Sequence, residues 1–265
     1  MPGTSIQRNN ARIVGTASRT VILAHGFGTD QTAWRHQEAD LARDHRVVLF
    51  DHVGAGRSDL AAYSPRRYQS LRSYAADMLE LFDDLGLGEV DYVGHSMSGM
   101  IGLLAALDEP ERFRKMIFIG ASPRYLNDEG YCGGFEQKDI DALFEAMTGS
   151  YHAWASGFAG VAMGNPDRPE LAQEFAATLC AIRPDIALAV SRLIFLSDHR
   201  EDLPKLRVPT LIVQTKSDVA VPREVGEYLA RHIPSAEIDV IDAQGHLPHM
   251  SAPAAVTAAI RAYLG

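Results

Sequence analysis

Three side chains with complementary acid-base chemistry occur in the chain in the order Ser96, Asp218 and His246. A serine hydroxyl becomes a nucleophile when a base takes its proton, and an imidazole base needs a carboxylate that fixes its tautomer and stabilises the imidazolium. Each of the three residues comes just after a predicted strand, so a parallel sheet would bring them to one edge. The set predicts attack by Ser96, with His246 as the base and Asp218 as the residue that orients it.

Ser96 lies within VDYVGHSMSGMIGLLAAL, residues 90–107. The apolar run that ends at Val93 predicts a buried strand, GHSM predicts a tight turn, and the small-residue-rich run after it predicts a helix. A serine at the apex of such a turn is accessible to a base and to a substrate carbonyl. The pattern departs from G-x-S-x-G because Ser98 replaces the last glycine and Gly99 comes one residue late. The alternative interpretation is a packing turn with a buried serine.

Other acidic and imidazole side chains compete for the same roles. Asp242 lies very near His246 on the same loop, and Asp198 falls in a predicted helical insertion. His249 lacks the setting of a strand followed by a glycine. We expect these three residues to be structural or to support the site from behind.

The loop after the strand predicted at residues 20–24 reads HGFG and leads to a helix predicted through Trp34. In enzymes with a serine turn of this kind, the second donor to the oxyanion comes from the loop after an early strand. The backbone amides of Phe27 and Met97 are therefore the predicted oxyanion hole. The alternative is an ordinary connection between a strand and a helix.

The remaining patterns describe the elements that must position these residues. Strands are predicted at 46–50, 116–119, 211–213 and 238–241, and a helix at 70–85. Their alternation predicts an α/β fold, with a mostly parallel sheet flanked by helices on both faces.

A dinucleotide site is the main cofactor alternative. Gly54 and Gly56 follow the strand at 46–50, but Asp59 occupies the place of the third glycine and no long helix begins there. Cys132 and Cys180 are too few and too far apart for a metal site or a disulfide framework. We expect no cofactor and no metal, and both cysteines to be structural thiols.

The composition limits the class of protein. A chain of 265 residues with 46% hydrophobic content buries a full core and is expected to be one catalytic domain. A net charge of −9 without a run of Lys or Arg argues against nucleic acid and anionic membranes as partners. The first 19 residues are polar and no apolar stretch is long enough to span a membrane, so we expect a cytoplasmic protein.

The strand signal is absent between residues 122 and 202. Four helical patterns occupy this interval, near residues 136–148, 151–163, 169–181 and 185–197. They predict a helical lid, 122–202, inserted between a first core segment, 1–121, and a second, 203–265. Aromatic residues are frequent in and beside the lid, and about half of them would pack the lid on the core while the rest form an apolar ceiling. They are Phe135, Phe144, Tyr151, Trp154, Phe158, Phe175 and Phe195.

These motifs together resemble the α/β-hydrolase superfamily, and more narrowly the RsbQ-type stress-signalling hydrolases of bacteria and the plant karrikin and strigolactone receptors. The resemblance runs nearly end to end. The segments that carry it are HGFGTDQTAW, DHVGAGRSDL, GHSMSGMIG, ASPRYLND, GGFEQ, RPDIALAV, SDHREDL and GHLPHMS.

The resemblance implies a parallel-sheet core under a lid of four helices, with the triad at Ser96, Asp218 and His246. It also implies a substrate-binding wall, in which Met97 replaces a valine common in that family. The wall residues are Phe27, Met97, Tyr125, Leu143, Trp154, Phe158, Phe175, Phe195 and Val219.

Three functions fit the sequence. The first is a cofactor-free serine hydrolase, an esterase or lactonase, for a small, largely apolar ester or lactone. The second is an RsbQ-like signalling hydrolase or receptor, whose lid surface binds a protein partner after the ligand is handled. The third is a non-hydrolytic enzyme on the same fold, either a lyase or a cofactor-free oxygenase. Charged residues on the lid helices would be a partner surface or simply a solvated face; they are Glu136, Lys138, Asp139, Asp141, Glu170 and Glu174.

Overall fold

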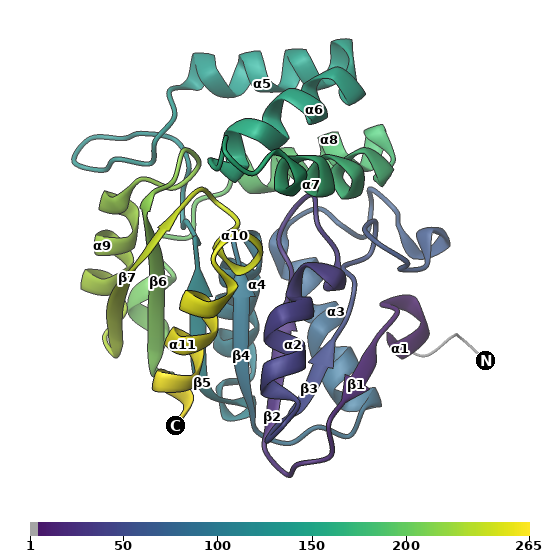
Figure 1. Ribbon diagram of the computed structural model, residues 1–265, viewed down its shortest axis with the longest axis vertical. Coiled ribbons are helices and arrows are strands. Elements are labelled where there is room, and N and C mark those ends of the chain that lie inside the picture. The colour runs from purple at the N-terminus through teal and green to yellow at the C-terminus, as the bar shows by residue number, and fades with distance from the viewer. Residues whose placement is uncertain (1–4) are drawn as a thin grey trace.

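A computed structural model describes residues 5–265, in which seven strands form a single sheet of order β1-β3-β2-β4-β5-β6-β7 (Figure 1). The strand β1 is antiparallel to β3, and all the other neighbouring pairs are parallel. The strands are β1 Arg12–Val14, β2 Thr20–Ala24, β3 Arg46–Leu49, β4 Val90–His95, β5 Phe113–Ile119, β6 Thr210–Ser217 and β7 Ala236–Gln244.

Helices connect the strands. The α-helices are α1 Ser5–Arg8, α2 Arg35–Leu41, α3 Leu71–Asp84, α4 Met97–Asp108, α5 Gln137–Gly149, α6 Tyr151–Met163, α7 Pro169–Ala181, α8 Pro184–Phe195, α9 Arg223–His232, α10 Pro248–Ser251 and α11 Pro253–Leu264. Short 3-10 helices occur at Gln31–Trp34, Leu60–Ala62, Pro110–Arg112 and Leu203–Lys205.

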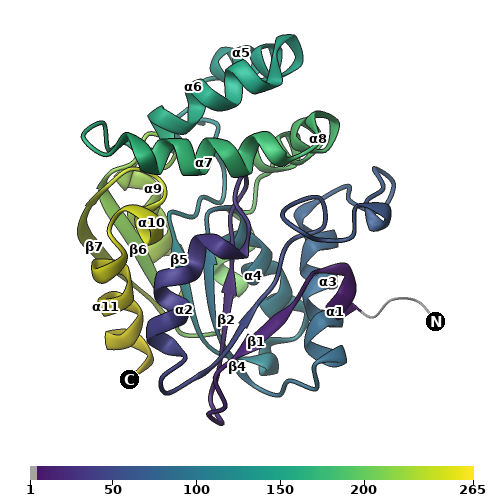
Figure 2. The ribbon, with the colours of Figure 1, turned by 45° about the vertical axis from the view of Figure 1, so that its right-hand side comes forward.

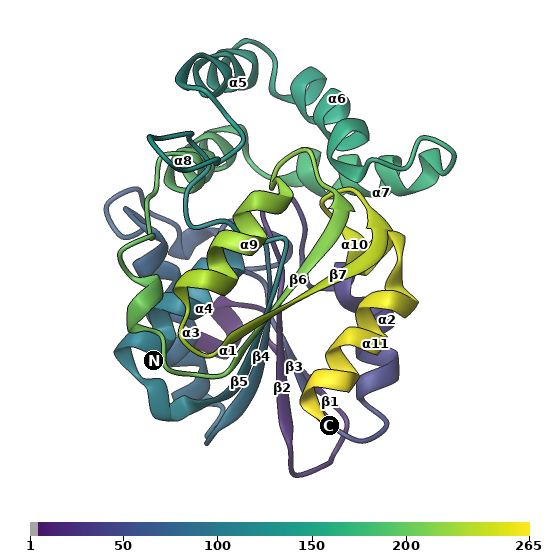
Figure 3. The ribbon, with the colours of Figure 1, turned by 90° about the vertical axis from the view of Figure 1, so that its left-hand side faces the viewer.

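The central strands are apolar on both faces because both faces are covered. In β2, Val21 and Leu23 pack into one apolar cluster with α2 and α11, whereas Ile22 and Ala24 pack into another with α3, α4 and α9. Figure 3 shows α9, α3 and α4 on one side of the sheet and α2 and α11 on the other. Burial of alternate side chains on opposite faces explains the continuous hydrophobic runs in the sequence.

The helices α5 to α8, called here the four-helix layer, lie between β5 and β6 in the chain and cover one end of the sheet (Figures 1 and 2). Local signals set their bounds. Pro169 and Pro184 each occupy the first position of a helix, where the missing N–H costs nothing. Gly164 ends α6 with a left-handed backbone, φ 63°.

The predicted α/β fold is confirmed, and all four inserted helices lie within about two residues of the predicted bounds. The predicted helix through Trp34 is wrong in type, because Gln31–Trp34 is a 3-10 turn capped by Asp30 and the α-helix is Arg35–Leu41. That α-helix buries only Gln37 and Leu41, so its sequence shows little of the apolar periodicity that predicts a helix. The α9 helix was not predicted.

The boundaries at residues 121/122 and 202/203 stay predictions, and residues 1–4 of the first segment lie outside the described residues. Within residues 5–265, no helix combines the length and the apolar character needed to cross a membrane.

Candidate active site

Ser96 occupies a strained turn between β4 and α4. Its φ and ψ are 54° and −120°, a backbone conformation that costs a non-glycine residue about 1–3 kcal/mol. Its amide donates to the carbonyl of Ile119 at 2.8 Å, which fixes the turn against β5. A Cβ on Gly99 would overlap the side chain of Ala121, so the helix packs directly on the sheet there. The sequence therefore folds locally into a sharp turn that presents the Ser96 hydroxyl.

The structure brings Ser96, His246 and Asp218 into one hydrogen-bonded chain. The Ser96 Oγ lies 2.9 Å from His246 Nε2, and His246 Nδ1 lies 2.8 Å from Asp218 Oδ2. Because a carboxylate accepts hydrogen bonds, Nδ1–H donates to Asp218 and the Nε2 lone pair faces the serine hydroxyl. The other Asp218 oxygen accepts from the amides of Ala220 at 2.8 Å and Val221 at 3.1 Å. This arrangement is suited to removing the proton of Ser96.

The competing acids point elsewhere. The Asp242 side chain is 88% exposed and pairs with Lys216 at 2.7 Å. The Asp198 carboxylate pairs with Arg124 and Arg200. Neither acid is hydrogen-bonded to His246.

His249 is buried behind the site. Its ring packs at a tilt against Trp34 and His95, with centroids 4.5 and 4.3 Å away. Burial lowers the pKa of His249 to about 3, so the ring is neutral. Its position makes it a packing residue.

Two contacts that hold the base were not expected from the sequence. His95 Nε2 donates to the carbonyl of His246 at 2.7 Å. The amide of His246 donates to the carbonyl of Ala162, the penultimate residue of α6, at 2.8 Å. Gly245 makes this approach feasible, because its φ is 85° and a Cβ there would overlap the carbonyl of Met163. The base is thus fastened both to the serine turn and to the four-helix layer.

Ser98 explains the departure from the glycine pattern. Its hydroxyl donates to the carbonyl of His25 at 2.6 Å and lies 2.8 Å from His52 Nε2. Since the hydroxyl proton is used on His25, His52 Nε2 must be the donor to Ser98 Oγ. A glycine at this position would lose both bonds.

The backbone amides of Phe27 and Met97 flank Ser96 from the two predicted loops. In the part of the chain that the structure describes, neither amide donates to a protein acceptor. Met97 is the first residue of α4, where the N–H has no partner within the helix and the helix dipole favours negative charge. The assignment of these two amides as the oxyanion hole stays a prediction.

A cavity opens onto Ser96 and His246. Its wall is mostly aromatic and aliphatic, and the wall residues carry no carboxylate, ammonium or guanidinium group. Burial raises the pKa of Tyr125, so its hydroxyl stays protonated. Besides Ser96, His95 and His246, the wall is Phe27, Tyr125, Phe158, Phe175, Ile194, Phe195, Ala220 and Leu247.

Four of the nine expected wall residues do not line this cavity. Trp154 stacks on Phe158 at 5.1 Å and 14°, so Phe158 takes the inner position. Leu143 lies on α5, the helix of the layer farthest from the sheet (Figure 1). Val219 is 50% exposed on the Asp218 loop, and the Met97 side chain lines a neighbouring cavity. Ile194, Ala220 and Leu247 were missed because no chemical signal distinguishes them.

Among residues 5–265 there is no group of three His, Cys, Asp or Glu side chains suited to holding a metal ion.

Comparisons with known proteins show which family the chain is similar to. The sequence matches a model of the alpha/beta hydrolase family over residues 21–260. It is 45% identical to the Karrikin insensitive 2 receptor CA of Petunia hybrida, over 93% of this chain and 92% of the receptor. It is 47% identical to a strigolactone esterase of Arabidopsis thaliana, over 95% and 94%. A solved hydrolase, olei00960 from Oleispira antarctica, is similar with a TM-score of 0.95 and 36% identity, over 98% and 95%.

Proposed function

This chain belongs to the alpha/beta hydrolase family, and we propose that it hydrolyses a small, largely apolar ester or lactone through Ser96, His246 and Asp218. The observation that carries the proposal is the unbroken hydrogen-bonded chain from Asp218 to Ser96, which ends in an apolar cavity. The relatives named as esterases favour hydrolysis over a lyase or a cofactor-free oxygenase.

In the first half of the reaction, Ser96 Oγ bonds to the carbonyl carbon of the substrate while His246 Nε2 takes the hydroxyl proton. The charge that develops on the carbonyl oxygen is stabilised by the amides of Phe27 and Met97. His246 then gives the proton to the leaving oxygen, whose bond to the acyl carbon breaks. Asp218 keeps the imidazole in the required tautomer and stabilises its protonated form.

In the second half, water attacks the acyl-enzyme with His246 again as the base, and the acid is released from Ser96. No step needs a cofactor. A lactone follows the same course, except that its leaving oxygen stays on the acyl group. The wall of the cavity favours uncharged substrates, because a buried charge without a partner is costly.

The substitution Ser96→Ala tests this proposal. We expect a loss of about 10⁴- to 10⁶-fold in the rate of 4-nitrophenyl acetate hydrolysis, with an unchanged melting temperature. Substantial turnover by a well-folded Ser96→Ala variant would refute it.

A second candidate is a receptor-like hydrolase that reports ligand turnover to a protein partner at the four-helix layer. Its support is the similarity to a protein named as a receptor, together with the bond from the His246 amide to the Ala162 carbonyl on α6. Through that bond the four-helix layer directly contacts the proposed catalytic base. Six charged positions were candidates for a partner surface. Glu136 and Asp139 form a capping box, Glu174 pairs with Arg35 and Asp141 accepts from Gln137, which among the described residues leaves Lys138 and Glu170 for a partner.

Amide hydrogen exchange separates the two candidates. A receptor-like protein should change protection across α5 to α8 when a covalent inhibitor occupies Ser96, since the ligand must favour one state of the layer. Unchanged protection with fast ester turnover would favour a metabolic esterase. Either role fits the cytoplasm, where the exposed thiol of Cys132 would stay reduced.

A further inference from the structure

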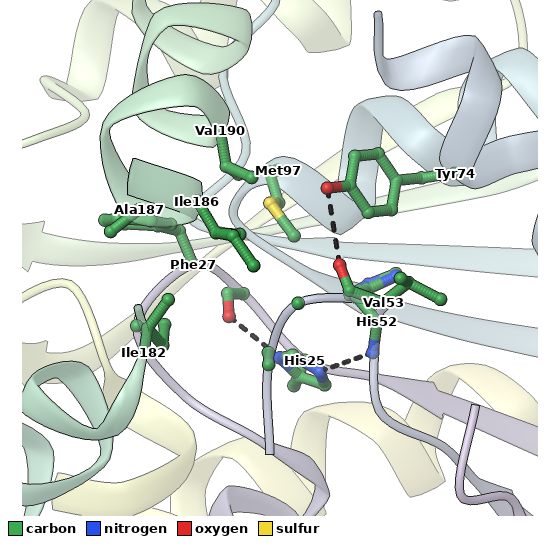
Figure 4. A pocket seen from close by; sticks show the side chains of 14 residues that line it. His25, Phe27, His52, Val53, Tyr74, Met97, Ile182, Ile186, Ala187 and Val190 are labelled. Atoms are coloured by element: carbon green, nitrogen blue, oxygen red, sulfur yellow. Dashed lines mark hydrogen bonds between the residues drawn. The ribbon is translucent and has the colours of Figure 1, made fainter. Parts of the chain in front are cut away.

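Figure 4 shows a second cavity. Phe27 lines both this cavity and the one at Ser96. Met97 also connects the second cavity to the reaction centre. Its backbone amide directly follows Ser96 in the chain, and its side chain lines the second cavity. On the side of the four-helix layer the wall is aliphatic and comes mainly from α8, at Ile186, Ala187 and Val190.

The polar side chains in this wall are already engaged. His25 Nδ1 pairs with the carbonyl of Gly26 at 2.9 Å, and His25 Nε2 accepts from the amide of His52 at 3.0 Å. His52 Nε2 donates to Ser98 at 2.8 Å. Burial lowers the pKa of both imidazoles, so both rings are neutral. With no carboxylate, ammonium or guanidinium group in the wall, the second cavity suits an uncharged, apolar occupant.

The position of the base decides which part of a substrate belongs in each cavity. His246 must protonate the leaving oxygen, and His246 lines only the Ser96 cavity. The leaving group therefore has to lie there. The carbonyl oxygen is held between the amides of Phe27 and Met97, which leaves the acyl substituent as the group that can pass along Phe27 and Met97.

We propose that the second cavity is the acyl subsite of this hydrolase and takes a short aliphatic group attached to the reacting carbonyl. The inference rests on the proposed function. It adds that the enzyme selects its substrates by the acyl group of the ester as well as by the leaving group. Met97 directly follows the nucleophile in the chain and lines this cavity, and its flexible, unbranched side chain can adapt to the length of the acyl group.

Two isoleucines on α8 give a matched test. Ile186 lines the second cavity and Ile194 lines the Ser96 cavity, and both are buried. The substitution Ile186→Phe should lower the ratio of hexanoate to acetate kcat/KM, measured with the 4-nitrophenyl esters, at least tenfold. The control Ile194→Phe should lower kcat/KM for both esters alike, because they share a leaving group.

A smaller side chain at Ile186 enlarges the second cavity without overpacking it, and should favour the longer acyl group. Ile186→Ala should raise the ratio of hexanoate to acetate kcat/KM severalfold. If Ile186→Phe and Ile186→Ala leave this ratio unchanged, the acyl subsite is refuted while the hydrolase function stands.

A binding measurement tests the acyl subsite without relying on catalysis. In a Ser96→Ala background, calorimetry with the uncleaved 4-nitroanilides of acetic and hexanoic acid should show that Ile186→Phe weakens only the hexanoic anilide, by tenfold or more. Equal weakening of both anilides, or of neither, would overturn the assignment. If the anilide measurements come out as expected but the wild-type protein cleaves no ester, the acyl subsite stands as a binding site and the proposed function is contradicted.

Discussion

Replacing Gly245 should damage stability and catalysis together, because this residue joins the base to the four-helix layer. Its φ of 85° costs an L-residue about 1–2 kcal/mol. An added Cβ would also overlap the carbonyl of Met163, which is backbone and cannot turn aside. The displacement strains two hydrogen bonds, Gly245 N to Ser217 O at 2.7 Å and His246 N to Ala162 O at 2.8 Å, each contributing about 1 kcal/mol.

We therefore expect Gly245→Ala to lower the free energy of unfolding by about 2–4 kcal/mol in urea denaturation. A shift of His246 by about 1 Å from Ser96 should lower kcat/KM by about 10²-fold. The matched control is Gly160→Ala on α6, where a Cβ meets nothing within 4 Å and should stabilise the helix by about 0.5–1 kcal/mol. Gly245→Ala with wild-type stability and activity would refute the reasoning.

Two further predictions concern the competing residues. Asp218→Asn should reduce ester hydrolysis by about 10⁴-fold while Asp242→Asn leaves it nearly unchanged, and the reverse order would show that the wrong acid was chosen. His249 has a pKa near 3 in the fold and about 6.5 when unfolded, so the unfolded chain binds the extra proton and stability falls as the pH drops below 6.5. His249→Phe should flatten the pH dependence of unfolding between pH 6 and 5 by up to about 1.4 kcal/mol per pH unit, and an identical slope in both proteins would contradict this.

The sheet and the three reactive residues could be predicted because their signals are local. Ser96, Asp218 and His246 each follow a strand or its loop, and parallel strands bring those positions to one edge without any knowledge of packing. The inserted helices were also predictable, since Pro169 and Pro184 fix where two of them begin.

The wall of the cavity could be predicted only in part, because sequence position does not give side-chain direction. Trp154 and Phe158 are four residues apart on α6, yet their rings stack in two layers and only Phe158 reaches the cavity. The contact between Gly245 and Met163 joins segments about 80 residues apart and leaves no local pattern. From the sequence alone, Gly245 predicts only a turn beside the proposed base, because the helix that packs on it, α6, is distant in the chain.

The hydroxyl of Ser98 shows how a departure from a family pattern can stabilise the same site. It joins the carbonyl of His25 to the ring of His52, and the amide of His52 in turn donates to the ring of His25. Three loops are thereby closed into one network: the serine turn, the loop that carries Phe27, and the loop after β3. The amides of Phe27 and Met97 belong to two of these loops. The bond from Ser98 to the His25 carbonyl therefore joins the two segments that carry the proposed oxyanion donors.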